Sequence, residues 1–166
     1  MVDNLYKKIL LSDRLALSKA ITLIESTKLN DRNKSEKLIK KLYKKSGKSL
    51  RIGISGSPGV GKSTFIETLG MFLTNKNYKV AVLAVDPSSK KTGGSILGDK
   101  TRMEKLSINK NAFIRPSPSS GHLGGVAKRT SESILCLEEA GFNIIFVETM
   151  GVGQAEIDVY DMGLDW

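Results

Sequence analysis

A glycine-rich segment followed by a lysine and a serine carries the strongest chemical signal in this sequence of 166 residues. Residues 56–63 read GSPGVGKS and match the pattern G-x-x-x-x-G-K-[ST]. Loops of this kind turn backbone N–H groups toward a polyphosphate, and glycine reaches the required backbone conformations without steric cost. Lys62 would supply a positive charge to the terminal phosphates, and Ser63 a hydroxyl ligand for Mg²⁺. The pattern therefore predicts a nucleoside-triphosphate site.

The segments on either side of this loop fit the prediction. Residues 50–55 form a short, mostly apolar run typical of a buried parallel strand, and residues 62–74 have a helical pattern. The positive N-terminal end of that helix would point at the same anion. We favour this interpretation over an ordinary glycine-rich turn, because the strand-and-helix context that the motif requires is present. The candidate phosphate-binding residues are Gly56, Ser57, Pro58, Gly59, Val60, Gly61, Lys62, Ser63 and Thr64.

Acidic residues follow two further apolar runs, at the points where the expected strands end. In an open α/β sheet, ligands bind at the carboxyl edge of the strands, so Asp86 and Glu148 would lie beside the phosphate loop. Glu148 has the position and charge of the acid that holds magnesium in such sites, and Gly151 would let the backbone approach the γ-phosphate. Asp86 and Asp99 are weaker candidates individually, because loop aspartates commonly cap helices or turns.

The alternation of strand and helix patterns predicts an α/β fold, with a mainly parallel sheet flanked by helices. Strands are expected at residues 50–55, 79–85, 113–115 and 143–147. Helices are expected at residues 4–11, 12–26, 32–45, 62–74 and 126–140, with a short helix opening at 99–102. Residues 116–125 are interpreted as a loop because they contain few apolar groups.

The excess positive charge lies at the N-terminus. The chain has a formal net charge of +9, and residues 1–51 contain 14 Lys and Arg against 5 Asp and Glu. A basic face could dock on an acidic partner or on nucleic acid. We favour a solvated helical face and expect no nucleic-acid partner, since the segment lacks interleaved aromatic residues and a recognisable nucleic-acid module. Residues 1–49 are thus predicted to form a small helical extension, and residues 50–166 the nucleotide domain.

Apolar residues at helical spacing identify the inner faces of that extension. In the stretch 12–26, Leu17, Ile21 and Ile24 fall on one face. In the stretch 32–45, the residues expected to face inward are Leu38, Ile39, Leu42 and Tyr43. These helices are expected to cover the nucleotide domain and not to form a core of their own.

The single cysteine and the lack of long apolar runs restrict the cellular setting. Cys136 is the only cysteine, so the chain has no internal disulfide, which fits a reducing compartment. Its place between two leucines in a helical pattern predicts a small core residue. No run approaches the length of a membrane-spanning helix, and the N-terminus lacks the apolar region of a signal peptide. We therefore expect a cytoplasmic protein without a membrane partner.

Four segments of the sequence resemble one family. They read GISGSPGVGKSTFIETLG, VAVLAVDPSSKKTGGSILGDKTRM, NAFIRPSPSSGHLGGVAKRTSE and FVETMGVGQAE. Together they look like the MeaB/ArgK family, P-loop GTPases of the SIMIBI class that chaperone cobalamin-dependent methylmalonyl-CoA mutase. The resemblance runs from residue 51 to residue 156 without an obvious gap, and the basic N-terminal helices fit that family's helical extension.

The resemblance implies a function and a set of site residues. GTP or GDP and Mg²⁺ would be the cofactors, with Ser63 as a metal ligand and Asp86, Asp99 and Glu148 as the acidic group around the metal. Lys62, Asp99 and Glu148 would serve GTP hydrolysis, which proceeds mainly by positioning and charge stabilisation. Two switch loops, 86–102 and 148–160, would respond to the γ-phosphate and relay that state to the mutase. The expected function is a GTP-hydrolysing chaperone for cofactor loading and protection of methylmalonyl-CoA mutase.

The sequence departs from the family pattern where it stops. Complete members continue with a guanine-reading N-K-x-D motif and a C-terminal dimerisation region, so a fragment or an early stop is expected here. Guanine preference therefore rests on the resemblance alone, and a homodimer is implied only for complete members. Two alternatives stay open. One is a P-loop kinase of the older ArgK description, which would need an acceptor site, and the other is an inactive truncated fragment.

Overall fold

Four parallel strands form the sheet of the computed structural model, which describes residues 2–43, 49–86, 103–118 and 123–149. The order of the strands across the sheet is β1-β4-β2-β3. Their bounds are Leu50–Ile54 for β1, Val80–Asp86 for β2, Ala112–Pro118 for β3 and Ile144–Thr149 for β4. Every pair of neighbours is parallel, so the predicted α/β fold with a parallel sheet is confirmed.

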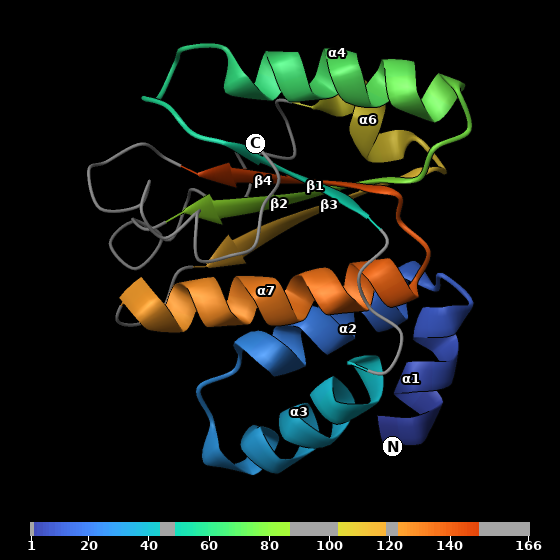
Figure 1. Ribbon diagram of the computed structural model, residues 1–166, viewed down its shortest axis with the longest axis vertical. Helices are drawn as coiled ribbons and strands as arrows, with labels where there is room; N and C mark the ends of the chain where they lie inside the picture. The colour runs from blue at the N-terminus through green and yellow to red at the C-terminus, as the bar shows by residue number, and fades with distance from the viewer. Residues whose placement is uncertain (1, 44–48, 87–102, 119–122, 150–166) are drawn as a thin grey trace.

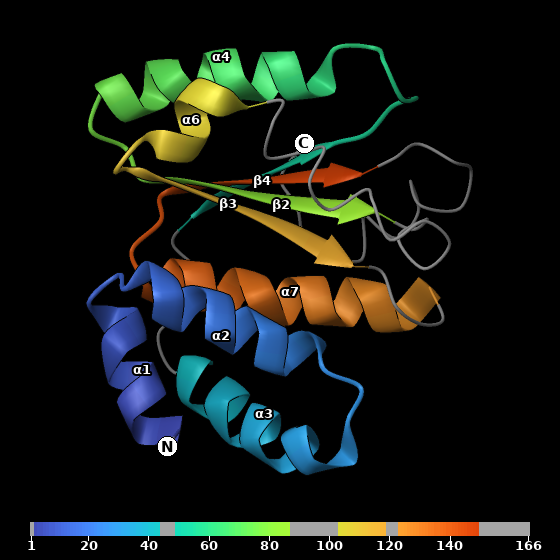
Figure 2. The ribbon, with the colours of Figure 1, turned by 180° about the vertical axis from the view of Figure 1, so that it is seen from behind.

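Helices cover both faces of this sheet (Figures 1 and 2). On one face lie α4 (Lys62–Asn75) and α6 (Glu104–Ile108). On the other face lie α7 (Leu123–Glu139) and α2 (Arg14–Glu25), with α1 (Val2–Leu10) and α3 (Leu29–Leu42) farther from the strands. None of the helices that the structure describes is long and apolar enough to cross a membrane.

Successive residues of β2 point to opposite faces and so contribute to two hydrophobic cores. Ala81, Leu83 and Val85 pack in the core shared with α2 and α7. Val80 and Val82 pack in the core shared with α4 and α6. This period of two, with both faces apolar, is what a central strand between two helical layers requires.

The N-terminal helices pack against α7 and the sheet through the first of these two cores. Leu17, Ile21 and Ile24 are buried, as their spacing predicted, and belong to the same cluster as residues of α7, β2 and β4. In contrast, Tyr43 is 64% exposed, so its predicted inward position is wrong. Helix α3 ends at Leu42 and its inner stripe is completed by Leu38 and Leu42, which leaves Tyr43 at the C-cap and outside the core.

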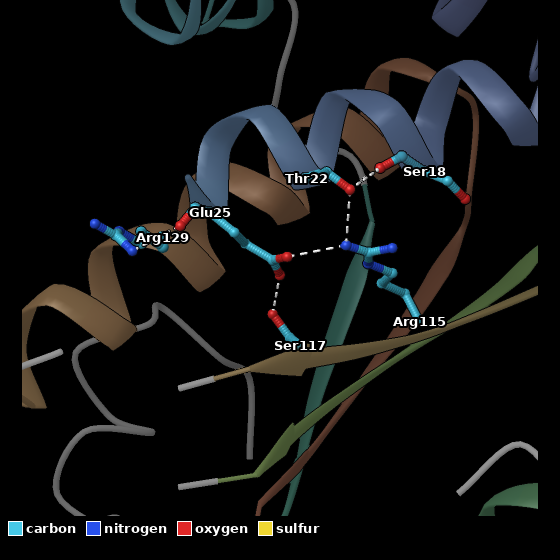
Figure 3. Close-up of polar contacts among 6 residues, drawn as sticks. All are labelled: Ser18, Thr22, Glu25, Arg115, Ser117 and Arg129. Atoms are coloured by element: carbon cyan, nitrogen blue, oxygen red, sulfur yellow. Dashed lines mark hydrogen bonds and ion pairs between the residues drawn. The ribbon is translucent and has the colours of Figure 1, made fainter. Parts of the chain in front are cut away.

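Polar contacts around Glu25 join the N-terminal helices to the sheet (Figure 3). The Glu25 carboxylate is buried, accepts a hydrogen bond from Arg115 Nη2 at 3.0 Å, and accepts another from the Ser117 hydroxyl. Arg129 of α7 donates to the backbone carbonyl of Glu25 at 2.8 Å. Charge-assisted bonds of this kind satisfy a carboxylate that burial would otherwise destabilise. The end of α2 is therefore held by both β3 and α7.

The strand β3 is longer than its sequence pattern predicted. The predicted loop 116–125 is wrong at both ends, because Pro116–Pro118 still pair with β2 and α7 already begins at Leu123. The loop was predicted because this stretch contains few apolar groups, but β3 is an edge strand of the described sheet, where prolines with their missing N–H cost little. The short helix α6 is present, whereas residues 99–102, where it was expected to open, lie outside the described residues.

Cys136 lies in the core, as predicted, and its burial leads to a testable expectation. Its side chain is inaccessible, and burial raises the pKa of the thiol. We expect a thiol reagent at pH 8 to modify Cys136 at least roughly 10³-fold more slowly in the native chain than in guanidinium, because an opening free energy of about 5 kcal/mol must be supplied first. Stopped-flow labelling checks this. Labelling of the native chain at the rate of a free cysteine would contradict it.

Candidate functional site

The loop between β1 and α4 has the backbone conformation that its glycines predicted. Gly59 and Gly61 have φ angles of 84° and 93°, in the left-handed region where a side chain would be strained. Gly61 is also the N-cap of α4, so the helix begins at Lys62 directly after this turn. The chain therefore makes a tight turn between β1 and α4, and the backbone of the loop lies at the N-terminal end of this helix.

Lys62 crosses this loop. Its Nζ donates hydrogen bonds to the carbonyl oxygens of Gly56 at 2.7 Å and of Ser57 at 3.0 Å. These bonds keep the ammonium group at the loop, and they hold the loop in a turned shape. The other predicted loop residues are open to solvent; they are Ser57, Pro58, Gly59, Val60, Gly61 and Thr64.

The N-terminal end of α4 is available for an anion. No side chain among the described residues caps this helix, so its first backbone N–H groups are not engaged by a capping oxygen. The helix dipole adds a partial positive charge at the same end. Together with the ammonium of Lys62, these groups form an anion-binding concavity of the kind that suits phosphate.

Glu148 lies directly beside the start of α4. It is the fifth residue of β4, and in the sheet register it pairs with Ile54 of β1 and Ala84 of β2. The residue is 9% exposed, and its Oε1 accepts a hydrogen bond from the Ser63 hydroxyl at 3.2 Å. The sheet order explains this contact, since β4 is the neighbour of the strand that leads into the loop. The structure therefore brings together three of the predicted residues, Lys62, Ser63 and Glu148.

The other predicted acidic positions are described only in part. Asp86 ends β2, two residues beyond the partner of Glu148, so its backbone lies at the same edge of the sheet. The Asp86 side chain lies outside the described part, as do Asp99 and Gly151. Among the residues that the structure does describe, no group of three or more metal-ligating side chains occurs.

Two hydroxyl groups near this edge were not identified from the sequence. Ser55 directly precedes the loop and Thr149 directly follows Glu148. The Ser55 and Thr149 side-chain oxygens are buried without a hydrogen-bond partner among the described residues. Buried hydroxyls of this kind are rare unless a ligand, water or ion satisfies them. Ser55 directly follows β1 and Thr149 is the last residue of β4. These positions were the available signal in the sequence, because the carboxyl ends of strands lie at the ligand-binding edge.

The donor atoms that meet here suit Mg²⁺. Magnesium is bound by oxygen ligands, commonly one or two from the protein, with the remainder from water and substrate phosphates. Ser63 Oγ and Glu148 Oε1 supply a hydroxyl and a carboxylate oxygen within 3.2 Å of each other. The chemistry of these two donors therefore fits a phosphate-bound magnesium ion.

Comparison with known proteins places this arrangement in a family. The family described as methylmalonyl-CoA mutase-associated GTPase MeaB matches residues 17–164. The chain belongs to the MeaB family. Its members are P-loop GTPases, and the matched residues include β1, the loop, α4 and β4.

Several proteins similar to this chain carry related names. A "Probable GTPase" of Mycobacterium tuberculosis is 55% identical over 97% of the chain, and a mitochondrial "methylmalonic aciduria type A homolog" of Mus musculus is 49% identical over 97%. "GTPase ArgK" of Escherichia coli is 51% identical over 90%. The crystal structure of an LAO/AO transport system kinase superposes with a TM-score of 0.78 at 37% identity, over 95% of the chain.

The chain spans about half the length of these relatives. It covers 48% of the M. tuberculosis protein, 41% of the mouse protein, 45% of the E. coli protein and 46% of the kinase structure.

Proposed function

We propose that this chain binds GTP with Mg²⁺ at the loop 56–61 and the start of α4, and hydrolyses it. The contact between Ser63 and Glu148 carries this proposal, because it brings a magnesium-type donor pair to the end of an anion-binding loop. Membership of a family of GTPases supports guanine as the base. The division into a helical extension, residues 1–49, and a nucleotide domain, residues 50–166, is part of the same proposal.

Each residue of the site would have a separate role. Lys62 would release the carbonyls of Gly56 and Ser57 and place its ammonium on the terminal phosphates. The loop N–H groups and the first turn of α4 would bind the phosphate oxygens. Ser63 would be a direct metal ligand, while Glu148, with Asp86 and Asp99, would hold the metal through water. Bound Mg²⁺ neutralises the charge that develops on the phosphates.

We further propose that the GTPase cycle serves methylmalonyl-CoA mutase, in loading and protecting its cobalamin cofactor. The family description, which names this mutase, supports the proposal. Loops that follow β2 and β4 would report the γ-phosphate to the mutase by an order–disorder transition. We place this activity in the cytoplasm. We propose a homodimer only for longer members of the family.

Thermal unfolding tests the nucleotide site. With Mg²⁺ and a non-hydrolysable GTP analogue at a hundred times its dissociation constant, we expect about 2.7 kcal/mol of stabilisation, or roughly 5–11 °C in Tm. The ATP analogue should give a much smaller shift. The Glu148→Gln variant should lose most of the Mg²⁺-dependent part of the shift, since the metal loses a charged neighbour. Glu104→Gln, at an exposed acid of α6, is the matched control and should behave as wild type.

Four results would contradict parts of the proposal in distinct ways. Equal shifts with both analogues would contradict guanine preference, and the absence of any shift would contradict the site. Release of inorganic phosphate identifies a GTPase, whereas transfer to an added acceptor would favour the kinase that the name of the structural relative suggests. An affinity for the mutase that is the same with the GTP analogue, with GDP and without nucleotide would contradict the relay.

A further inference from the structure

A groove runs along the outer side of helix α2, away from the nucleotide site. Its volume is about 720 Å³. The residues of helix α2 that line the groove are one, three or four positions apart in the sequence, so they lie on one continuous face of the helix. These residues are Leu15, Ala16, Lys19, Thr22 and Leu23, and the C-cap residue Ser26 continues the same face. One face of α1 and the turn before α3 also line the groove, and Arg115 of β3 reaches it from the sheet.

The acidic and the lysine side chains that line this groove differ in whether they have partners. The carboxylates of the lining already have partners: Asp13 accepts from the Ala16 N–H at 2.8 Å, and Asp31 accepts from the Ser26 hydroxyl at 2.7 Å. Glu25, the third, accepts from Arg115 at 3.0 Å. The three lysines of the lining have no such contacts. Among the described residues, no ion pair or side-chain hydrogen bond engages the ammonium groups of Lys8, Lys19 and Lys28.

The remaining surface of the groove is largely apolar. Leu15 is 65% exposed although it lies in the middle of the amphipathic extension, and Leu5 and Leu23 are only partly buried. A concave strip that combines exposed leucine with unpaired lysines is complementary to a helix that has leucine-like anchors and acidic flanks. The described lining contains no aromatic side chain on which a nucleic-acid base could stack, which favours a peptide over RNA.

We propose that this groove is a docking site for an acidic amphipathic segment of a protein partner. The apolar residues Leu5, Leu15 and Leu23 would contact the apolar face of the segment, and Lys8, Lys19 and Lys28 its carboxylates. The groove extends to Thr22 and Arg115, which are hydrogen-bonded to each other in the network around Glu25 (Figure 3). This inference rests on the proposed function, in which the partner is the protein that the GTPase serves. The groove would contact that partner separately from the nucleotide-dependent loops.

A model peptide tests the groove without the natural partner. We would use a fluorescein-labelled 18-residue peptide of leucine and glutamate, with leucines at helical spacing, and measure its fluorescence anisotropy with the full chain at 0.15 M salt. Reversing the three groove charges (Lys8→Glu, Lys19→Glu, Lys28→Glu) should weaken binding by at least about tenfold. Leu15→Ser should also weaken it. Circular dichroism verifies that each variant is folded.

A second triple variant controls for net charge. Lys34→Glu, Lys37→Glu and Lys40→Glu make the same charge change at exposed positions of α3 that do not line the groove. At this ionic strength the screening length is about 8 Å, so charge changes at exposed residues outside the lining should alter peptide affinity by no more than about threefold. Equal losses in the two sets, no binding to the wild-type chain, or equal binding of a lysine version of the peptide would each overturn the proposal.

Two further measurements separate the remaining outcomes. The first is binding of a uridine oligonucleotide to the same variants. If the wild-type chain binds the oligonucleotide more tightly than the acidic peptide, and only the triple variant of the groove lysines loses this binding, the groove is a nucleic-acid site and the proposal is overturned. Binding of methylmalonyl-CoA mutase is measured with the same variants. A wild-type chain that binds the peptide in the groove but not the mutase would contradict the proposed function and leave the groove as a site for another acidic partner.

Discussion

Replacing Lys62 with alanine is expected to lower the affinity for GTP by about 10- to 150-fold and to reduce hydrolysis to the background rate. A hydrogen bond to a charged group contributes about 1.5–3 kcal/mol, and Lys62 is the cation that the loop holds at its centre. The affinity is measured by titration with a fluorescent GTP analogue, and hydrolysis by phosphate release.

The matched control for this variant lies at the other end of the same helix. Lys76→Ala removes a lysine at the C-cap of α4 and should leave both the affinity and the rate unchanged. Lys62 packs in no core, so the Tm of the nucleotide-free Lys62→Ala chain should stay close to that of wild type. Wild-type affinity in Lys62→Ala would show that the phosphates bind elsewhere.

Replacing Glu25 with alanine is expected to destabilise the fold by about 3 kcal/mol. The change removes the carboxylate that pairs with Arg115 and accepts from Ser117, and it leaves a guanidinium that is 22% exposed without its counter-charge. Removing one partner of a buried pair costs about 3–5 kcal/mol, and the partial exposure of Arg115 favours the lower value. For a chain of this size the Tm should fall by roughly 6–12 °C in a thermal scan.

Two further variants show whether the loss comes from the unpaired charge. Glu36→Ala removes an exposed acid from the i,i+4 pair with Arg32 and should change stability by less than about 0.5 kcal/mol. The double variant Glu25→Leu, Arg115→Met should recover much of the lost stability, because a buried pair can be replaced by apolar residues at little cost. A double variant as unstable as Glu25→Ala would contradict this explanation.

Much of the fold followed from local patterns. The strands β1, β2 and β4 and the helices α2, α4 and α7 were predicted within a few residues, because each has a regular apolar pattern bounded by turn residues. The loop glycines and Lys62 were predicted from a motif whose chemistry is local. The position of Glu148 beside Ser63 also followed, since a parallel sheet brings strand ends to one edge.

The errors and omissions come from long-range contacts. Pro116 was assigned to a loop because residues 116–125 contain few apolar groups, and the sequence does not show that this stretch begins in an edge strand. Tyr43 was assigned to the core because helical spacing does not show where a helix ends. Glu25 and Arg115 are 90 positions apart in the sequence, and nothing about either residue or its neighbours in the sequence indicates that it has a buried partner.

The order of the strands also has a consequence for biosynthesis. Strand β1 pairs with β4 alone in the described sheet, with Leu50 opposite Ile144, so its partner is translated more than ninety residues later. At about 5–20 residues per second, β1 and the loop after it wait roughly 5–20 s on the ribosome without a neighbouring strand. Glu148 reaches Ser63 only when β4 is in place. The donor pair proposed for the metal therefore forms only after residue 149 has been made, and it cannot guide the earlier steps of folding.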